Sequence, residues 1–160
     1  MAEEVKVPKT KKVSKSTLTY YEGVGRRKSA IARVRLHLTK KGSVVIGETT
    51  HKAGAFIVND KALEKVFIST ADQMLCKKPL VVCDSIDSYV VTVKSLGGGR
   101  TGQVDAISLG LARALVQIPA ADLRPKLKAE GLLTRDSRIR ERRMVGTGGK
   151  SRRLKQSPKR

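Results

Sequence analysis

Residues 89–118 read YVVTVKSLGGGRTGQVDAISLGLARALVQI and hold the two clearest secondary-structure patterns of the chain. In the first part the side chains alternate, with Val91 and Val93 on one face and Lys94 on the other, which is typical of a half-buried strand. From residue 104 to 118, apolar residues recur every three or four positions, and Pro119 follows. That spacing predicts an amphipathic helix ending before the proline. The stretch therefore predicts a strand, a glycine-rich turn over residues 97–103 and a helix.

A second alternating stretch lies nearer the N-terminus, in residues 20–38. One face carries small and apolar side chains: Ala30, Ala32, Val34, Leu36 and Leu38. The other face carries polar ones, with Ile31 as an exception: Ser29, Arg33, Arg35, His37 and Thr39. The cluster Arg26-Arg27-Lys28 precedes them. A cationic strand face is commonly just solvated, but with the charge of the whole chain added, the pattern favours an RNA-facing surface.

The remaining patterns are shorter. We expect a hairpin turn at residues 40–43, strands at 44–46 and 56–58, and a helix at 61–67. Ser69 or Thr70 is expected to cap a helix running through Lys77, with Pro79 ending it and residues 80–83 forming a buried strand. Residues 122–130 predict a last helix, closed by Gly131. With no internal repeat and no second core, the chain predicts one α+β domain, residues 20–133, between a basic leader (1–19) and a basic tail (134–160).

Charge dominates the composition. The chain has 34 Lys and Arg against 14 Asp and Glu, a net charge of +20. Residues 134–160 contain eleven basic and two acidic residues, a net charge of +9, and offer little apolar surface to bury. Such a segment is expected to be extended unless a partner orders it, and the last fifteen residues can then span about 50 Å. The partner is expected to be polyanionic: a nucleic acid, or else an anionic membrane or a polyanionic chaperoning partner.

Several classes of protein find no support in the sequence. No apolar run approaches the roughly 20 residues that span a bilayer, and the leader lacks the apolar region of a secretory signal. Cys76 and Cys83 do not form a CxxC pair, which predicts buried thiols in a reducing compartment rather than a disulfide or metal site. We therefore expect a cytoplasmic protein with no membrane partner.

The glycine-rich turn is the most enzyme-like feature. Backbone N–H groups at a helix N-terminus can bind phosphate, but GGGRTGQ fits neither the P-loop nor the dinucleotide fingerprint. It can be a plain turn, a nucleotide site, or a contact to a nucleic-acid backbone assisted by Arg100. His37 and His51 have no ligand at metal spacing and are expected at the surface. Since the acidic residues are scattered too, we expect no enzyme, no cofactor, no metal and no small-molecule substrate.

The nucleic-acid interpretation has its own alternatives. The helix at 104–118 exposes mainly Ser108, Arg113 and Gln117, a poor surface for reading duplex DNA. With two Phe and three Tyr in the chain, an aromatic platform for stacking bases is also absent. What remains is binding to the backbone and shape of folded RNA, which depends strongly on salt concentration.

Four motifs in this order resemble small-subunit ribosomal protein nine of the bacterial type: GRRKSAIARV (25–34), GGGRTGQ (97–103), LGLARAL (109–115) and GLLTRD (131–136). The resemblance covers residues 20–160. It implies a four-stranded mixed sheet packed on helices, like domain two of ribosomal protein S-five. It also implies a place in the head of the small subunit, with small-subunit rRNA and other head proteins as partners. In that family the basic tail reaches the P-site tRNA, which assigns tRNA contact to Lys159 and Arg160 here.

The chain departs from the family pattern in three places. Residues 39–54 form a longer segment than usual, the leader is additional, and the ending QSPKR lacks the usual aromatic residue. Pro158 also fixes one φ angle beside the tRNA-contacting pair. The alternatives to a ribosomal role are an enzyme that binds a nucleotide phosphate at residues 97–102 and a non-specific, histone-like binder of DNA or RNA. The candidate rRNA-binding residues are Arg26, Arg27, Lys28, Arg33, Arg35, Gly98, Gly99, Arg100, Thr101, Gln103, Arg135, Arg138, Arg140, Arg142, Arg143, Lys150, Arg152 and Arg153.

Overall fold

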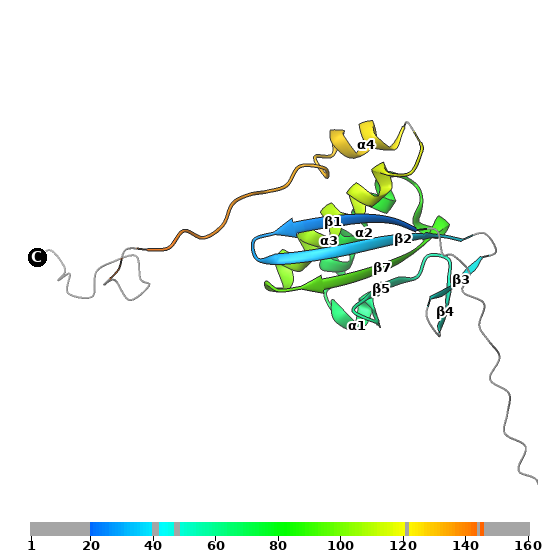
Figure 1. The fold of residues 1–160 in the computed structure, drawn as a ribbon, viewed down its shortest axis with the longest axis horizontal. Helices are drawn as coiled ribbons and strands as arrows, with labels where there is room; N and C mark the ends of the chain where they lie inside the picture. The colour runs from blue at the N-terminus through cyan, green and yellow to red at the C-terminus, as the bar shows by residue number, and fades with distance from the viewer. Residues whose placement is uncertain (1–19, 40–41, 47–48, 121, 144, 146–160) are drawn as a thin grey trace, which may run out of the picture.

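The two alternating stretches pair with each other at the centre of the sheet. β2 (Ala30–Leu38) and β7 (Tyr89–Leu96) run antiparallel, with Val34 opposite Val93. β1 (Tyr20–Arg27) pairs antiparallel with the other edge of β2, and β5 (Phe56–Val58) lies parallel to β7. Figure 1 shows two helices, α2 (Thr70–Val82) and α3 (Arg100–Val116), behind this sheet. The expected α+β class, a mixed sheet packed on helices, is confirmed. The strand order is β1-β2-β7-β5-β6, so a short fifth strand, β6 (Lys61–Ala62), adds to the four expected.

The structure is a computed structural model that describes residues 20–39, 42–46, 49–120, 122–143 and 145. Within these residues, no helix has both the length and the apolar character needed to cross a membrane. The predicted turn residues Lys40 and Lys41 fall outside the described part of the chain, as do residues 146–160 of the tail.

The helix predicted from its apolar stripe is α3 (Arg100–Val116), which lies against β1 and β2 and begins earlier than expected, directly after Gly99. Ile107, Leu111 and Leu115 of the stripe are fully buried. α2 (Thr70–Val82) and α4 (Leu123–Ala129) complete the helical layer. α4 ends before Gly131, whose φ of +68° is the left-handed conformation predicted for a helix-closing glycine.

Glycines allow β1 to lie directly on α3. Gly23 and Gly25 face the helix, and a Cβ at Gly25 would overlap the backbone of Ala106. On the helix side, a Cβ at Gly110 would come within 2.9 Å of the Val34 side chain and 3.0 Å of the Gly25 nitrogen. Strand and helix therefore meet backbone to backbone, closer than any larger side chain permits.

The strand predicted at residues 80–83 is wrong, because α2 continues through Pro79 to Val82. Cys76, Pro79, Leu80 and Cys83 are all buried, and their spacing of three and four places them on one helical face. Pro79 lies in the last turn, so few helical hydrogen bonds follow it. Ser69 occupies the N-cap position as expected, but its side chain makes no capping bond. Instead the Gln73 side chain donates to the Phe67 carbonyl at 2.8 Å.

The predicted hairpin between β2 and the next strand is also wrong. β3 (Ser43–Ile46) pairs with β4 (Thr49–Lys52) to form a separate two-stranded sheet. β2 already has β1 on one edge and β7 on the other, so it has no free edge for β3. The sequence patterns predict no element at residues 49–52, which form the strand β4. The helix predicted at 61–67 is reduced to α1 (Leu63–Val66), since Lys61 and Ala62 form β6.

Both cysteines are free and buried, as predicted. Burial raises the pKa of the Cys76 thiol to about 12, with the carboxylate of Asp72 as the next cause. At neutral pH this thiol is therefore protonated and a poor nucleophile or metal ligand.

Candidate nucleic-acid interface

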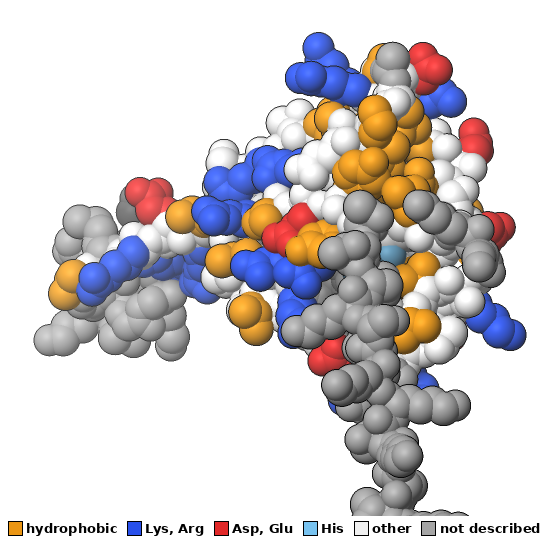
Figure 2. Space-filling model, turned by 45° about the vertical axis from the view of Figure 1, so that its right-hand side comes forward, with side chains coloured by type: hydrophobic (Ala, Val, Ile, Leu, Met, Phe, Trp, Pro, Cys, Tyr) orange, Lys and Arg blue, Asp and Glu red, His pale blue; other side chains and the backbone are white. Residues whose placement is uncertain are grey.

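Four cations lie in a row across the face of the sheet that points away from α3. By register Arg33 of β2 is opposite Lys94 of β7, and Arg35 follows two residues later on the same face of β2. Arg26 of β1 pairs with Ile31, whose side chain is 46% exposed on this face. We call Arg26, Arg33, Arg35 and Lys94 the outer-face row. Figure 2 shows Lys and Arg side chains in a band that runs from the tail onto the domain.

The outer-face row keeps a positive charge despite one internal carboxylate. Glu22 accepts from Arg35 at 2.9 Å and lies 3.3 Å from Arg33, so one acid is shared between two guanidinium groups. The Arg35 guanidinium also stacks over the Tyr20 ring, with its carbon 4.8 Å from the ring centre. Exposed ion pairs of this kind are weak, worth about 0–1 kcal/mol, so a phosphate can compete for these arginines. Arg33 remains 57% exposed in spite of its ion pair.

A hollow of about 570 Å³ opens beside the row. Arg33, Arg35 and Lys94 line it from the sheet, and Ile46 and His51 line it from the β3–β4 hairpin. Its volume lies within the roughly 300–1,000 Å³ of pockets that hold small organic groups. The extra segment at residues 39–54 therefore gives the cationic face a concave wall.

His37 does not belong to this exposed surface, contrary to prediction. Its side chain is 4% exposed, and its Nε2 lies 3.0 Å from the Thr92 hydroxyl on the neighbouring strand. The Tyr20 ring lies 5.6 Å away. Burial, followed by the positive charge of Arg35, lowers the pKa of His37 below its usual value, so this imidazole is neutral at pH 7. Leu38, expected inside, is 37% exposed at the end of β2.

The glycine-rich loop is explained largely by packing. Gly97 and Gly98 have φ of +70° and +67°, which disfavour any side chain. A Cβ at Gly97 would lie 2.8 Å from the Ser29 carbonyl oxygen, and one at Gly98 would lie 2.8 Å from the Cβ of Ala30. The loop therefore rests on the turn between β1 and β2. Gly99 has no such contact and is the N-cap residue just before α3.

The loop leads into the N-terminus of α3, whose first backbone N–H groups have no partner within the helix. Such a helix N-terminus favours the binding of an anion. Arg100 stands there with 70% of its side chain exposed, and its Nε is 3.2 Å from Asp72. Thr101 is exposed as well. Gln103 instead turns back, and its side-chain amide donates to the Gly97 carbonyl at 3.1 Å. The loop residues predicted to bind RNA thus divide into exposed groups and groups that hold the loop itself.

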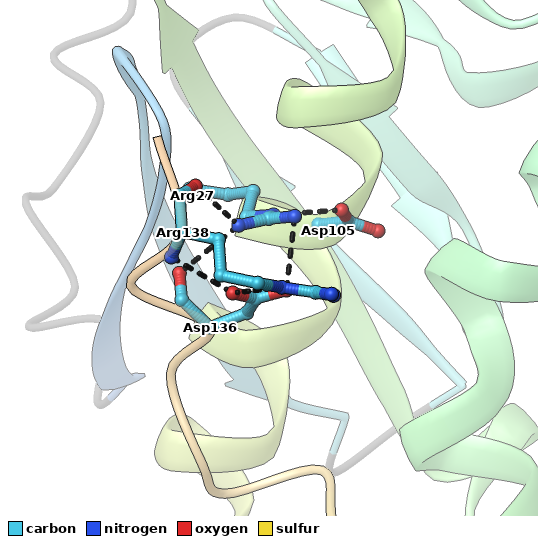
Figure 3. A network of polar contacts seen from close by, with 4 residues as sticks. All are labelled: Arg27, Asp105, Asp136 and Arg138. Atoms are coloured by element: carbon cyan, nitrogen blue, oxygen red, sulfur yellow. Dashed lines mark hydrogen bonds and ion pairs between the residues drawn. The ribbon is translucent and has the colours of Figure 1, made fainter. Parts of the chain in front are cut away.

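Arg27 points the opposite way from its neighbour Arg26. Strand alternation places it on the α3 side of β1, in line with Gly23 and Gly25, and its side chain is only 13% exposed. Its Nε lies 3.3 Å from Asp105 of α3, and its Nη2 lies 2.9 Å from Asp136 in the tail (Figure 3). Arg27 is thus occupied within the chain. Lys28, at the turn with φ of +52°, is exposed.

The described start of the tail is extended and carries exposed arginines. Arg135, Arg140 and Arg142 are exposed, and the trace leads away from the domain (Figure 1). Arg138 is 85% exposed but folds back onto Asp136 at 2.8 Å. Hydrogen bonds from Arg138, with Arg27 nearby, hold the pKa of the Asp136 carboxyl well below its usual range. The predicted RNA contacts Lys150, Arg152 and Arg153 and the predicted tRNA contacts Lys159 and Arg160 lie outside the described residues.

Two surface residues were not nominated from the sequence. Lys94 completes the outer-face row, and Tyr20 supports Arg35. The alternation of residues 89–96 already placed Lys94 on the exposed face of its strand, and its pairing with Arg33 requires the register that only the structure supplies. Nothing in the sequence signalled the contact between Tyr20 and Arg35.

The described residues contain no group of three or more His, Cys, Asp or Glu side chains that could hold a metal ion. What they do contain is a cationic sheet face, an exposed helix N-terminus and an arginine-rich tail. A comparison with protein-family models matches residues 25–160 to the family described as ribosomal protein S9/S16. Since that match covers most of the sequence and includes all four motifs singled out above, the chain belongs to the ribosomal protein S9/S16 family, whose members are RNA-binding ribosomal proteins of the translation machinery.

Proposed function

We propose that this protein is a structural constituent of the small-subunit head in cytoplasmic ribosomes. It binds small-subunit rRNA by backbone and shape contacts, and its tail reaches the P-site tRNA. The observation that carries the proposal is the outer-face row, found in a chain of the ribosomal protein S9/S16 family. Cations spread over a strand face recognise a phosphate backbone without reading its sequence. Other proteins of the head are further expected partners.

Three surfaces would contact rRNA in this proposal. The outer-face row and its hollow supply Arg26, Arg33, Arg35 and Lys94. The loop and the N-terminus of α3 supply Gly98, Gly99, Arg100 and Thr101, with Lys28 at the neighbouring turn. The tail supplies its exposed arginines and, further along the sequence, Lys150, Arg152 and Arg153. Gln103 supports the loop, and Arg27 is engaged within the chain by Asp105 and Asp136.

The proposed tRNA contact falls on Lys159 and Arg160, the two residues that match the Lys-Arg pair to which the family resemblance assigns this contact. A short cationic end suits a phosphate backbone, since each neutralised phosphate releases a counterion. The missing aromatic residue removes a stacking contact, so we expect this tail to act on tRNA through charge alone.

Sedimentation tests the ribosomal role. A tagged copy expressed in cells is expected to migrate with small subunits and translating ribosomes in a high-magnesium gradient, because rRNA phosphates in the subunit bind its basic side chains. A matched variant, Arg33→Gln with Arg35→Gln and Lys94→Gln, removes three members of the outer-face row without touching the core. We expect it to shift towards the free fraction, more strongly as salt is raised. A wild-type protein that remains free of small subunits would contradict the proposal.

The same protein also permits a test of the enzyme alternative. Because Gly97 and Gly98 pack on Ser29 and Ala30, two of the loop glycines already have a structural role. Titration calorimetry with ATP, GTP and NAD is expected to show no tight binding. Salt-insensitive binding that is lost on Gly99→Val would instead favour a nucleotide site. Equal affinity for duplex DNA and small-subunit rRNA would favour a non-specific binder.

A further inference from the structure

The guanidinium of Arg27 connects three segments that are far apart in the sequence. It belongs to the last residue of β1, and it contacts α3 through Asp105 and the tail through Asp136. Its Nη1 also donates to the backbone carbonyls of Asp136 at 3.2 Å and Arg138 at 2.9 Å. Figure 3 shows the four side chains converging on this point. One side chain therefore holds both the carboxylate and the main chain of the tail.

We propose that Arg27, with Asp105, Asp136 and Arg138, forms a joint that fixes the direction in which the tail leaves the domain, and that Arg27 itself does not contact RNA. We call these four residues the tail joint. Its effect on tRNA binding rests on the proposed function, whereas its presence in the free protein does not. Arg26, one residue earlier, supplies the natural comparison, because it points to the outer face.

The tail joint follows an apolar attachment of the same segment. Leu132 and Leu133 are partly buried against the core, and Gly131 sets the turn out of α4 with its positive φ. After the joint, Ile139 is 69% exposed, so the apolar attachment does not continue. The core contacts thus bring the chain to β1, and the joint sets its course from there.

The geometry requires an arginine and not merely a positive charge. The two carboxylates and two carbonyls surround the guanidinium, and its planar fork offers five N–H donors at fixed angles. A lysine has three donors on a single nitrogen and cannot reach all these acceptors at once. By contrast, a lysine can replace an arginine that only neutralises a phosphate, since it serves there as a point charge.

Asp136 has a second partner that strengthens the joint. Arg138 donates from its backbone N–H at 2.9 Å and from its side chain at 2.8 Å to 3.1 Å. These bonds tie Arg138 back to Asp136, and the Arg27 bond to the Arg138 carbonyl fixes this pair of residues on the domain. Asp136 thereby links a local conformation of the tail to a position on β1.

The test compares Arg27→Lys with Arg26→Lys in the full-length protein. In the free protein, backbone order parameters measured by NMR for residues 136–138 are expected near about 0.85 in the wild type and in Arg26→Lys. Arg27→Lys is expected to lower them below about 0.6. Asp136→Asn serves as a second variant that leaves β1 and α3 unchanged, and it should give the same loss. Order parameters of Arg27→Lys equal to those of the wild type would overturn the proposal.

Salt dependence of rRNA binding supplies the second readout. Arg27→Gln is expected to leave the slope of log K against log salt unchanged, because no phosphate contact is removed. Arg26→Gln should reduce the slope by about 0.7–0.9, the value for one phosphate. An equal reduction in both variants would mean that Arg27 contacts RNA, which overturns the proposal. If the wild type fails to bind rRNA, the proposed function fails, while the order parameters still decide the joint.

Reconstituted small subunits show the consequence for the tail. Arg27→Lys is expected to weaken P-site tRNA binding as much as removal of residues 157–160 does. Combining the two changes should cause no further loss, because a misdirected tail and a missing tip remove the same contact. Fully additive losses would contradict the joint's role in aiming the tail.

Discussion

Replacing Gly25 by alanine is expected to destabilise the protein by about 3 kcal/mol or more, at the upper end of overpacking costs. The added Cβ would overlap the Ala106 backbone and come within 2.5 Å of the Gly110 nitrogen. Neither neighbour is the flexible end of a side chain, so β1 or α3 must move as a whole. Because domains of this kind are stable by about 5–15 kcal/mol, the loss is a large share of the total. Equilibrium unfolding in urea at high salt measures it.

Gly99→Ala is the matched control for this experiment. It makes the same chemical change at the start of α3, where a Cβ would meet nothing within 4 Å and the glycine φ of −110° is open to alanine. We expect it to cost less than about 1 kcal/mol, the typical loss for a weaker N-cap. Similar unfolding midpoints for the two variants would show that β1 does not rest on α3 as described. Gly110→Ala, on the helix side of the same contact, is expected to fall between them.

The parts of the fold that sequence periodicity predicted are those with long, clean patterns. β2, β7 and α3 each present one buried face over eight or more residues, so their alternation or helical stripe survives in the sequence. The outward positions of Arg33, Arg35 and Lys94 follow from the same alternation, whereas their place next to one another requires the strand register. Where only a few apolar residues stand together, as at residues 80–83, a period of two and a period of 3.6 cannot be told apart, so the sequence predicts a strand where α2 continues.

The sequence did not predict that the Arg27 side chain points towards α3, and the reason is a different one. Alternation marks a strand face through its apolar residues, but the inner face of β1 carries Gly23 and Gly25, which have no side chain to reveal it. Arg26, Arg27 and Lys28 therefore read as one basic cluster. Only the contact between β1 and α3 shows that the middle residue of the cluster lies on the other side of the strand.

Local sequence patterns also do not show which strands occupy the two edges of β2, or which side chains are buried by segments far away in the sequence. β3 cannot pair with β2 because β7, some fifty residues later, holds that edge. His37 is buried although it shares a face with Arg33 and Arg35, because Thr92 and the Tyr20 ring stand beside it. In both cases the deciding neighbour comes from a part of the chain that local patterns do not connect.

Deletion of residues 134–160 is expected to impair assembly of the small subunit. The deletion removes eleven basic residues and Asp136, and with Asp136 the tail side of the joint. The exposed arginines Arg135, Arg140 and Arg142 alone account for about 2–3 units of the salt slope of rRNA binding if each neutralises one phosphate. Filter binding to small-subunit rRNA over a salt series, followed by gradient analysis of reconstituted subunits, measures both effects.

Deletion of residues 157–160 is the matched change, because it removes only Lys159 and Arg160 among the basic residues and leaves the described tail in place. We expect assembly to remain close to that of the wild type, with the rRNA salt slope within the experimental error, while P-site tRNA binds more weakly. The difference follows from position. On the proposed function, the tail joint and the arginines after it hold the segment to the domain and to rRNA, so the last four residues contribute only at the tRNA. Equal assembly defects in the two truncations would mean that the tail has one role along its whole length. The joint would then have no effect on the direction of the tail beyond that of the rRNA contacts.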